Sequence, residues 1–403
     1  MQLSKYFADA RTYFVLFGVL VVGALLLSEF LTQRLNLYDF RVMYSAAEAY
    51  LSGEQVYGIP FGLKTGFYKY SPFTILVFMA YTPLDYPMAC VVHFLIIGCA
   101  VIGVILSLEK LIRQYTTPVR GRTFLLLLAV FLSVFIHLFR DLHLGNINII
   151  LVCLLTMALA AAVSGRYYRA GFLLAFVILA KPYFLVVMLA FVAFGYWKTV
   201  ASTAGWVSIF ILLTVVVMGP SESFSLHKQW VAAMMAHGDY LGSPHTISSL
   251  LFFYLGLEMS GKFAFFFLPV VAIGITYFSW RINRQFSFVD TEEATAAKSQ
   301  GLIFNFYLLM AIIPSILITD TEHFLFSLPL IALLCFHRPK AHVGWTIMLV
   351  VVLLLFGGNS SDMLGMDLSR QVNRWGLLGI SNLCVLGMII YQFWGRKNRK
   401  AIP

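Results

Sequence analysis

Long apolar segments recur from one end of this sequence to the other, and they constrain its fold more than any other feature. Runs of about 20 apolar residues, each long enough to cross the ~30 Å hydrocarbon core of a bilayer, alternate with short charged breaks. Hydrophobic residues make up 60% of the 403 residues and charged residues only 11%. A soluble domain has about 25% charged residues. The pattern predicts an all-α polytopic membrane protein.

The apolar runs predict about twelve transmembrane helices. Their expected centres are residues 20, 97, 131, 155, 175, 190, 209, 271, 310, 330, 350 and 384. No hydrophilic segment is long enough for a separate soluble domain, so residues 1–403 are predicted to form one integral membrane domain. The first run, Thr12–Leu27, has no small-residue cleavage site after it and is expected to be retained as a span.

Basic residues predict the orientation of the chain in the membrane. With the N-terminus in the cytoplasm, most of the 28 Lys and Arg residues fall on cytoplasmic connections, including the tail "RKNRK". A basic excess on short cytoplasmic loops sets orientation, so both termini are predicted to be cytoplasmic. The longer loops, 32–71, 219–245 and 358–374, then face the outside. The net charge of +10 is thereby explained as a topology signal, and a nucleic-acid partner is not expected.

The first outer loop contains "NLYDFRVMYSAAEAYLSGEQVYG" (36–58), a polar stretch directly after the first span. Asp39 is the candidate base, because a carboxylate near low-dielectric surroundings can take a proton from a hydroxyl. "YSAAEAYLSG" (44–53) predicts a short interfacial helix ended by Gly53. Its tyrosines and "FYKYSPF" (67–73), which includes Tyr70, could form an interfacial aromatic belt. The alternative is a solvated loop whose acids face water.

A second polar cluster lies in "HLFRDLHLGNINIILV" (137–152), between two expected spans. It contains Arg140, Asp141, His143, Asn146 and Asn148. Ionisable groups at membrane depth are costly and usually line a polar cavity. The alternative is a helix-end pair of Arg140 with Asp141, with the asparagines capping the next helix.

Two further clusters are also expected on the outer side. Lys181 in "ILAKPYF" stands before a proline that cannot continue the helix, so it either snorkels to headgroups or binds a lipid phosphate. Glu322 and His323 lie in "ITDTEHFLFSLPL" (318–330), where a histidine beside carboxylates could hold a proton and bind an anion. Ordinary turn polarity is the alternative. His245 adds to this side from "HGDYLGSPHTISSLLFF" (237–253).

Several classes of protein are excluded or disfavoured by what the sequence lacks. It contains no Walker loop, GxSxG, HExxH or DxD motif, so a nucleotide-sugar donor bound from the cytoplasm is not expected. Its five cysteines lie in apolar runs without CxxC spacing, which predicts neither a metal site nor a disulfide framework. Four polar clusters on one face together predict an outward-facing cavity for an anionic, hydroxylated ligand.

The chain resembles glycosyltransferase family 87, membrane enzymes of GT-C architecture that use polyprenyl-phosphate sugars. The resemblance is carried by "YDFRVMYSAAEAYLSGEQVYG", "YKYSPFTILVFMAYTPL", "LGNINIILVCLL", "AGFLLAFVILAKPYFLV", "SPHTISSLLF" and "TEHFLFSLPL", in this order along the chain. It implies a GT-C-type fold with short interfacial helices in the first outer loop.

The resemblance also implies roles for individual residues. Asp39 matches the expected general base, Lys181 the lysine of a "KP" motif, and His323 the histidine before a late span. Asn148 matches the asparagine of a "GQxN" motif, in which this chain has Asn146 where glutamine is usual. Glu322 stands where an aspartate is expected. These two departures leave the donor sugar and the acceptor open.

The implied reaction is an inverting transfer of a hexose or pentose, mannose first, from a polyprenyl-phosphate donor to a glycolipid or glycan on the periplasmic or extracellular face of the inner membrane. No cofactor and no metal are expected. The expected donor phosphate and lipid contacts are Lys181, His323 and Arg140. The expected substrate contacts are Arg41, Tyr70, His143, Asn146, Asn148, His245 and Glu322. The alternatives are a transporter or flippase of a lipid-linked sugar and an oligosaccharide ligase with a diphosphate-linked donor.

Overall fold

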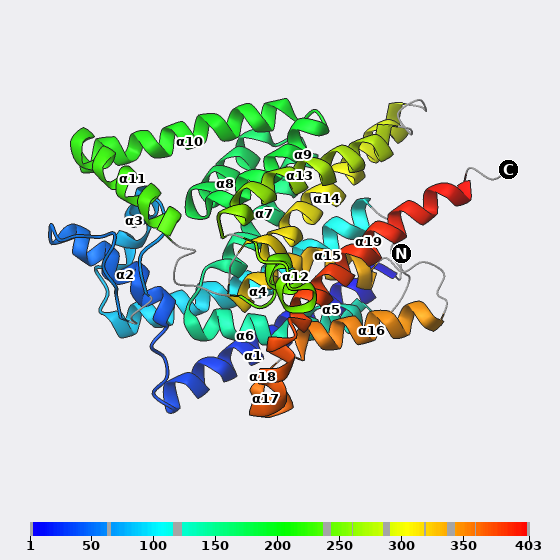
Figure 1. Cartoon of the computed structure of the whole chain (residues 1–403), viewed down its shortest axis with the longest axis horizontal. Coiled ribbons are helices and arrows are strands. Elements are labelled where there is room, and N and C mark those ends of the chain that lie inside the picture. Colours follow the sequence, from blue (N-terminus) through cyan, green and yellow to red (C-terminus); the bar gives the residue numbers. More distant parts are fainter. Residues whose placement is uncertain are drawn as a thin grey trace. The chain divides into compact units, whose positions relative to one another are not determined.

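The structure, a computed structural model, describes residues 3–62, 66–115, 123–236, 243–259, 261–284, 291–317, 320–336, 343–358 and 360–400. Throughout these residues the chain forms α-helices and short 3-10 helices, and the one bridge between extended residues joins Pro60 and Phe67 (Figure 1). The predicted all-α fold is confirmed.

The helices include candidate membrane spans of different lengths. Four helices in the described ranges are long and apolar enough to cross a membrane alone: Ala10–Leu31, Tyr86–Tyr115, Trp197–Met218 and Ala296–Ile316. Two bent pairs, Thr123–Ser133 with Phe135–Leu144 and Met366–Arg374 with Leu377–Gln392, raise this number to as many as six. The other apolar helices have 10–17 residues. The multi-pass fold is therefore confirmed, whereas the expected twelve spans and the orientation stay predictions.

The chain folds into two compact units. Unit 1 comprises Met1–Val15, Ile105–Leu138 and Gly242–Pro403, and unit 2 comprises Leu16–Val104 and Phe139–Leu241. The helices α1 (Leu3–Leu31), α4 (Tyr86–Tyr115) and α6 (Phe135–Leu144) contribute residues to both units. That residues 1–403 act as one domain stays a prediction.

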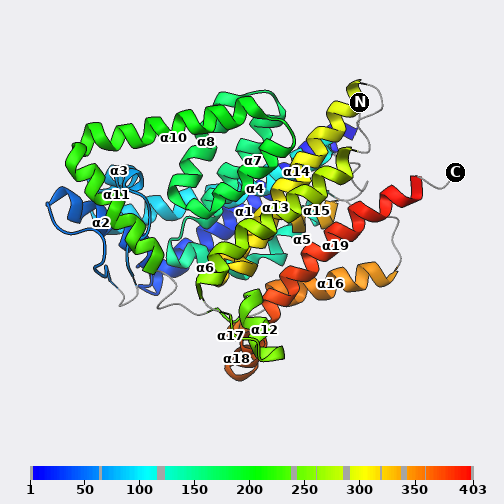
Figure 2. The same cartoon turned by 45° about the horizontal axis from the view of Figure 1, so that its top comes forward.

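Unit 2 contains most of the predicted site residues. Besides its parts of α1, α4 and α6, its elements are α2 (Tyr38–Leu51), α3 (Pro72–Phe78), η1 (Met79–Tyr81), α7 (Asn148–Val163), α8 (Tyr167–Ala180), η2 (Pro182–Val187), α9 (Met188–Ala193), α10 (Trp197–Met218) and α11 (Pro220–Met235). The apolar helix α8 packs between α7 and α10 (Figure 2). Gly171 makes this possible, since a Cβ there would lie 2.3 Å from the Oγ of Ser202 on α10. Close packing of this kind, through small residues, is typical of helices in membranes.

The described residues of the predicted first outer loop, 32–62 and 66–71, belong to unit 2. Its helix α2 begins at Tyr38, earlier than the predicted helix of residues 44–53, and it ends before Gly53, whose φ is +71°. Tyr44 and Tyr68 are only 4% and 0% exposed, so the expectation that they form an interfacial belt is wrong. Their hydroxyls have partners inside the unit, at the Leu84 carbonyl (2.8 Å) and at Thr74 (2.7 Å).

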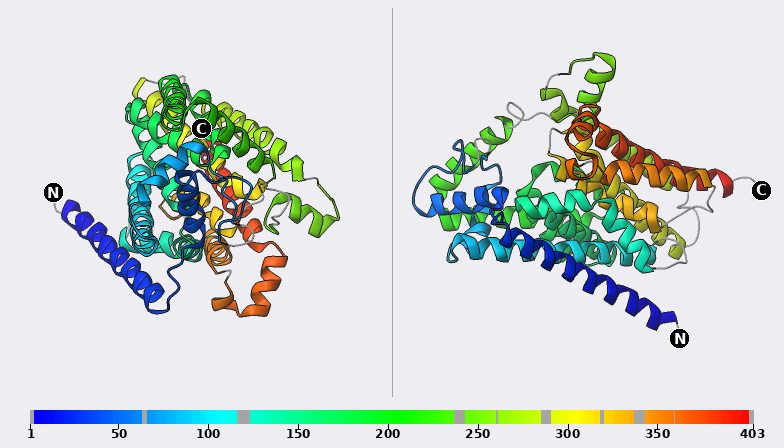
Figure 3. Two further views of the ribbon diagram at one scale, coloured as in Figure 1. Left: turned by 90° about the vertical axis from the view of Figure 1, so that its left-hand side faces the viewer. Right: turned by 90° about the horizontal axis from the view of Figure 1, so that it is seen from below.

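Unit 1 is a second helical assembly. Besides its parts of α1, α4 and α6, its elements are α5 (Thr123–Ser133), α12 (Ile247–Leu255), α13 (Gly261–Arg284), α14 (Thr291–Ile316), η4 (Thr321–Ser327), α15 (Leu328–Phe336), α16 (Val343–Gly357), α17 (Ser361–Leu364), α18 (Met366–Arg374) and α19 (Leu377–Lys400). The long helices α16 and α19 lie side by side (Figure 3). Asn382 of α19 donates to the Ala311 carbonyl (2.9 Å) and to Ser315 Oγ (2.8 Å) on α14. These buried hydrogen bonds fix α19 against α14.

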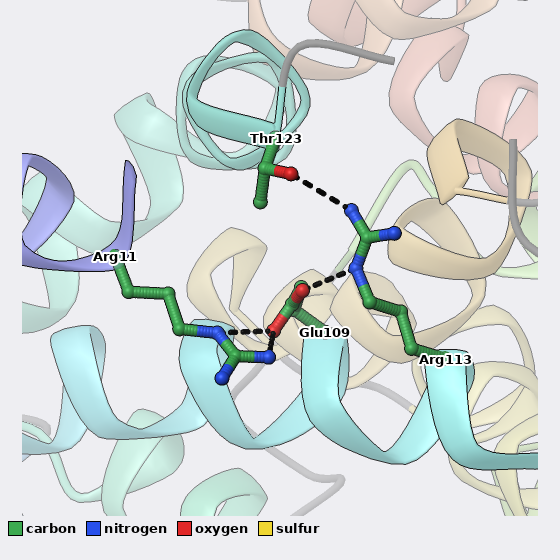
Figure 4. A network of polar contacts seen from close by, with 4 residues as sticks. All are labelled: Arg11, Glu109, Arg113 and Thr123. Atoms are coloured by element: carbon green, nitrogen blue, oxygen red, sulfur yellow. Dashed lines mark hydrogen bonds and ion pairs between the residues drawn. The ribbon is translucent and has the colours of Figure 1, made fainter. Parts of the chain in front are cut away.

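One buried carboxylate ties three helices of unit 1 together (Figure 4). The Glu109 side chain on α4 is 0% exposed and accepts from Arg11 of α1, at 3.0 Å from Nε and 2.7 Å from Nη2. It also pairs with Arg113 one turn later on α4, and Arg113 Nη2 donates to Thr123 Oγ1 of α5 at 3.1 Å. We call this network the Glu109 staple. Direct ion pairs with two guanidinium groups compensate for the cost of burying this carboxylate.

Candidate functional site

Asp39 lies in the first turn of α2, directly after a backbone distortion. The preceding N-cap residue, Leu37, has φ 39° and ψ 65°, a left-handed conformation that few non-glycine residues adopt. Such strain persists only where surrounding packing imposes it, and Leu37 is 1% exposed. Asp39 itself is partly exposed. A helix N-terminus favours a carboxylate anion, so this position suits a charged and reachable acid.

The carboxylate of Asp39 is held by Asn146, which comes from a different polar cluster of the sequence. Asn146 Nδ2 donates to Asp39 Oδ2 at 2.6 Å, across 107 positions of sequence. The other end of the amide is also fixed, because the Ile147 backbone N–H donates to Asn146 Oδ1 at 2.8 Å. Since an N–H can only donate, the NH2 group must face Asp39. Asn146 therefore fixes the orientation of the carboxylate.

A second chain of hydrogen bonds orients Lys181. Asp141 accepts from Asn148 Nδ2 and from the Ile149 backbone N–H, both at 3.0 Å. Asn148 Oδ1 in turn accepts from Lys181 Nζ at 2.5 Å. Asp141 and Asn148 are 0% exposed and Lys181 is 7% exposed. We call these three residues the lysine relay: an acid sets the direction of an amide, and the amide oxygen meets the ammonium.

The position of Lys181 follows from the sequence. The chain leaves α8 at Ala180, and Lys181 is extended, with φ −137° and ψ 96°. Pro182 disfavours a helical conformation in the residue before it and supplies no N–H, so α8 ends here and the 3-10 helix η2 follows. The predicted break at "AKPYF" is confirmed. Snorkelling is not what the structure shows, because the ammonium is buried and hydrogen-bonded to Asn148.

Asp141 is the residue that sequence reasoning missed. It was named in the second polar cluster without a role at the site, and a pair with Arg140 was the alternative; its hydrogen bonds come instead from Asn148 and Ile149, at the N-terminus of α7. Arg140 is exposed, and no ion pair or hydrogen bond joins it to another residue in the described ranges. Neighbouring helix residues do not face each other, which explains why the pair does not form. The sequence did contain a signal for the contact that forms: Asn148 follows Asp141 by seven residues, across the break between two helices.

Three other predicted contact residues in unit 2 have partners of their own. His143 Nδ1 lies 2.9 Å from Glu29 Oε1 near the end of α1. The exposed Arg41 guanidinium lies over the ring of Tyr86, 5.7 Å from its centroid. Tyr70 is partly exposed, and its carbonyl accepts from the Tyr57 hydroxyl at 2.8 Å. Burial raises the pKa of the Tyr57 phenol well above its usual value, so this donor stays protonated.

Glu322, His323 and His245 belong to unit 1. Glu322 is buried and His323 partly exposed, both on η4. The His245 ring lies 5.9 Å from that of Phe324, and the His323 ring lies 5.5 Å from that of Phe326. The structure therefore brings Asp39, Asn146, Asn148 and Lys181 together in unit 2, and it gathers the other three around η4 within unit 1. The first part of the 237–253 stretch, residues 237–242, lies outside the described residues.

The residues in the described ranges include no group of three His, Cys, Asp or Glu side chains placed to hold a metal ion. The site in unit 2 contains a partly exposed carboxylate, which can accept a proton, and a buried ammonium, which carries positive charge.

Comparisons with known proteins identify a family and a similar solved structure. The sequence model of glycosyltransferase family 87 matches residues 67–314, more than half of the chain. This range contains Asn146, Asn148 and Lys181, whereas Asp39 precedes it and His323 follows it. No curated protein matches the sequence. A solved structure similar to this chain is the crystal structure of ArnT from Cupriavidus metallidurans bound to undecaprenyl phosphate, with 11% identity, coverage of 96% of this chain and 78% of that chain, and a TM-score of 0.39.

Proposed function

This chain belongs to glycosyltransferase family 87, and from that membership we propose that it transfers a sugar from a polyprenyl-phosphate donor to a hydroxyl of a glycolipid or glycan. The transfer takes place on the periplasmic or extracellular face of the cell inner membrane, with both termini in the cytoplasm. The sugar is a hexose or pentose, with mannose as the first candidate.

One observation in unit 2 carries the proposal: a partly exposed carboxylate fixed by an amide lies in the same compact unit as a buried, oriented lysine. Sugar transfer from a lipid phosphate requires a proton acceptor for the incoming hydroxyl and positive charge at the departing phosphate. Asp39 and Lys181 meet these two requirements. The family match further favours a transferase over the transporter that the sequence left open.

In the proposed step the acceptor hydroxyl oxygen attacks the anomeric carbon on the face opposite the phosphate. A C–O bond to the acceptor forms while the C–O bond to the phosphate breaks, so the configuration inverts. Asp39 takes the hydroxyl proton as a general base, and polyprenyl phosphate leaves with the electron pair. The ammonium of Lys181 stabilises the negative charge that grows on the phosphate. Phosphate is a good leaving group, so no protonating acid is required.

The remaining predicted contacts fit this scheme as proposals. The exposed guanidinium of Arg140 is available to lipid phosphates, and Arg41, Tyr70 and His143 are proposed contacts to substrate hydroxyls in unit 2. For Glu322, His323 and His245, the roles in binding donor or acceptor stay predictions that rest on the resemblance.

The test is sugar transfer by purified protein given polyprenyl-phosphate sugars, with the products identified by mass spectrometry. We expect product from at least one such donor, and none from nucleotide sugars. Asp39→Asn should lower kcat by about 10²–10⁴-fold, the usual contribution of a general base, with donor binding retained. The matched control is Asp85→Asn, which changes an exposed aspartate of the same unit. Near-normal transfer by Asp39→Asn protein would refute the assignment of the base.

A further inference from the structure

A buried histidine outside the predicted site contacts both segments that carry the Asp39–Asn146 pair. His93 lies on α4, between the apolar residues "VV" and "FL", and is 1% exposed. An imidazole in such a place must have its polar atoms paired, because burying an unpaired polar group is costly. Both of its nitrogens have partners.

The hydrogen bonds of His93 define which nitrogen carries the proton. Nε2 lies 3.0 Å from the carbonyl oxygen of Gly145, and Nδ1 lies 3.1 Å from the hydroxyl of Tyr81. A carbonyl oxygen can only accept, so Nε2 donates to it. Nδ1 is then the acceptor for the Tyr81 hydroxyl. The neutral ring is satisfied at both ends.

The ring face of His93 supports the segment that carries the carboxylate. It stacks on Phe40 with ring centroids 4.2 Å apart and an interplanar angle of 13°. Phe40 is 0% exposed and directly follows Asp39 in the chain. Tyr81, which binds His93, also contacts Phe40, with ring centroids 5.0 Å apart. His93 and Tyr81 therefore hold the start of α2 in place.

The edge of the His93 ring supports the segment that carries the amide. Gly145 directly precedes Asn146 and has φ +69°, a left-handed conformation natural to glycine. A Cβ at Gly145 would lie 2.8 Å from the Cβ atoms of both Leu37 and Phe40, so the two segments meet backbone to backbone at this point. One imidazole thus stacks on the residue after Asp39 and hydrogen-bonds to the residue before Asn146.

We propose that His93 is a positioning residue for sugar transfer: its ring joins Phe40 to Gly145 and so keeps Asn146 hydrogen-bonded to Asp39. The inference rests on the proposed function, since it takes Asp39 as the base. His93 does not touch the substrate. It acts by holding the distance between a carboxylate and the amide that orients it, and small errors in such geometry reduce rates strongly.

The test compares two substitutions, each of which keeps one of the two interactions of the histidine ring. His93→Phe keeps an aromatic face for Phe40 but loses the donor to Gly145, whereas His93→Gln keeps an N–H donor at a similar reach. We expect His93→Phe to lower kcat by about 10–100-fold at unchanged KM for the donor, and His93→Gln to recover most of that loss. The matched control is His227→Phe, which removes another histidine of unit 2, one whose Nδ1 is 2.7 Å from a backbone carbonyl. It should leave kcat unchanged.

A double variant separates positioning from a general loss of structure. If His93 acts through Asn146, then Asn146→Ala with His93→Phe should be no slower than Asn146→Ala alone, because the hydrogen bond is already lost. The inference would be overturned if the kcat losses of the two single variants multiplied in the double variant. A change in KM with unchanged kcat would overturn it as well. If His93→Phe does not fold, Tyr81→Phe and His93→Gln decide the question by the same kcat and KM readout. An inactive Asp39→Asn protein beside an unaffected His93 series refutes this inference alone, while an active Asp39→Asn protein refutes the proposed base.

Discussion

Two carboxylates in this protein, Glu109 in unit 1 and Asp141 in unit 2, are equally buried, at 0% exposed, and they have different partners. Glu109 is held directly by the guanidinium groups of Arg11 and Arg113. Asp141 accepts hydrogen bonds from an amide and a backbone N–H, and the same Asn148 amide accepts a hydrogen bond from the ammonium of Lys181. In the first arrangement the charges of Glu109 and the two arginines form ion pairs that join helices. The second uses the acid to decide where an amide, and through it a lysine, points.

The difference shows how a buried acid can serve structure or function. Removing a directly paired buried carboxylate leaves its partners' charges uncompensated, so the free energy of unfolding falls. A carboxylate that orients an asparagine adds less stability but determines the direction of a dipole. Variants of the two networks should therefore separate folding from turnover.

Glu109→Gln should have the largest effect on stability. The substitution removes the only acid of the Glu109 staple and leaves Arg11 and Arg113 near each other without a counter-charge. Breaking a buried ion pair in this way costs about 3–5 kcal/mol of unfolding free energy. Thermal unfolding in detergent should show the loss, while turnover per folded molecule should stay near the starting value. A fall in turnover with unchanged unfolding would give Glu109 a role in the reaction and erase the contrast.

Asp141→Asn should have the opposite effect, with a large decrease in kcat and a small decrease in stability. A carboxylate accepts from both Asn148 and Ile149, whereas an asparagine presents an N–H2 to one of them and creates a clash of donors. If Asn148 turns its amide to relieve the clash, its own N–H2 faces Lys181 and the contact with the ammonium is lost. We expect kcat to fall by about 10–100-fold, with a stability loss of only about 1–3 kcal/mol.

The Asp141→Asn measurement pairs steady-state kinetics with thermal unfolding of the same preparation. Asp367→Asn, at the start of α18 in unit 1, serves as a surface control for loss of an aspartate. A large loss of stability with unchanged kcat per folded molecule would make Asp141 a second staple, equivalent to Glu109.

The sequence made the candidate side chains stand out, but it did not show their contacts. Charged and amide groups are rare in so apolar a chain, so Asp39, Asn146, Asn148 and Lys181 stand out in the printed sequence without any structure. Their partners are not visible there, because the hydrogen bond from Asn146 to Asp39 spans 107 positions. The alternative pair of Asp141 with Arg140 arose for the same reason: adjacency in sequence is visible, whereas the direction of each side chain on a helix is not.

Some features of the fold could also be predicted from the sequence, and others could not. The α-helical character follows from long apolar runs, and the end of α8 follows from Pro182. The count of spans does not follow, because helices such as α7 and α8, with 16 and 14 residues, are shorter than a full crossing. The Glu109 staple was also hidden. Its Arg113 contact is at the helical spacing i, i+4, but its Arg11 contact is 98 positions away.

Gly145→Ala should disturb the contact in unit 2 between the segments that carry Asp39 and Asn146. The new methyl group would lie 2.8 Å from the Cβ atoms of Leu37 and Phe40, and the backbone at this position has φ +69°. The left-handed alanine alone costs about 1–2 kcal/mol, and overpacking adds to that loss. Because the displaced segment carries Asn146, we expect kcat to fall together with stability. Gly165→Ala, at φ +75° with no atom within 4 Å of the added Cβ, measures the backbone strain alone.

Thr123→Val should give the smallest effect and thereby sharpen the contrast between the two buried acids. It removes the hydroxyl that accepts from Arg113 Nη2 at 3.1 Å and keeps the shape of the side chain. The direct pairs of Glu109 with Arg11 and Arg113 remain, so the expected loss is about 0.5–1.5 kcal/mol, the usual worth of one hydrogen bond. Thermal unfolding should show this small decrease with kcat unchanged. A loss as large as that of Glu109→Gln would mean that the staple depends on α5 as much as on its charges, and direct pairing would no longer explain why Glu109 is structural.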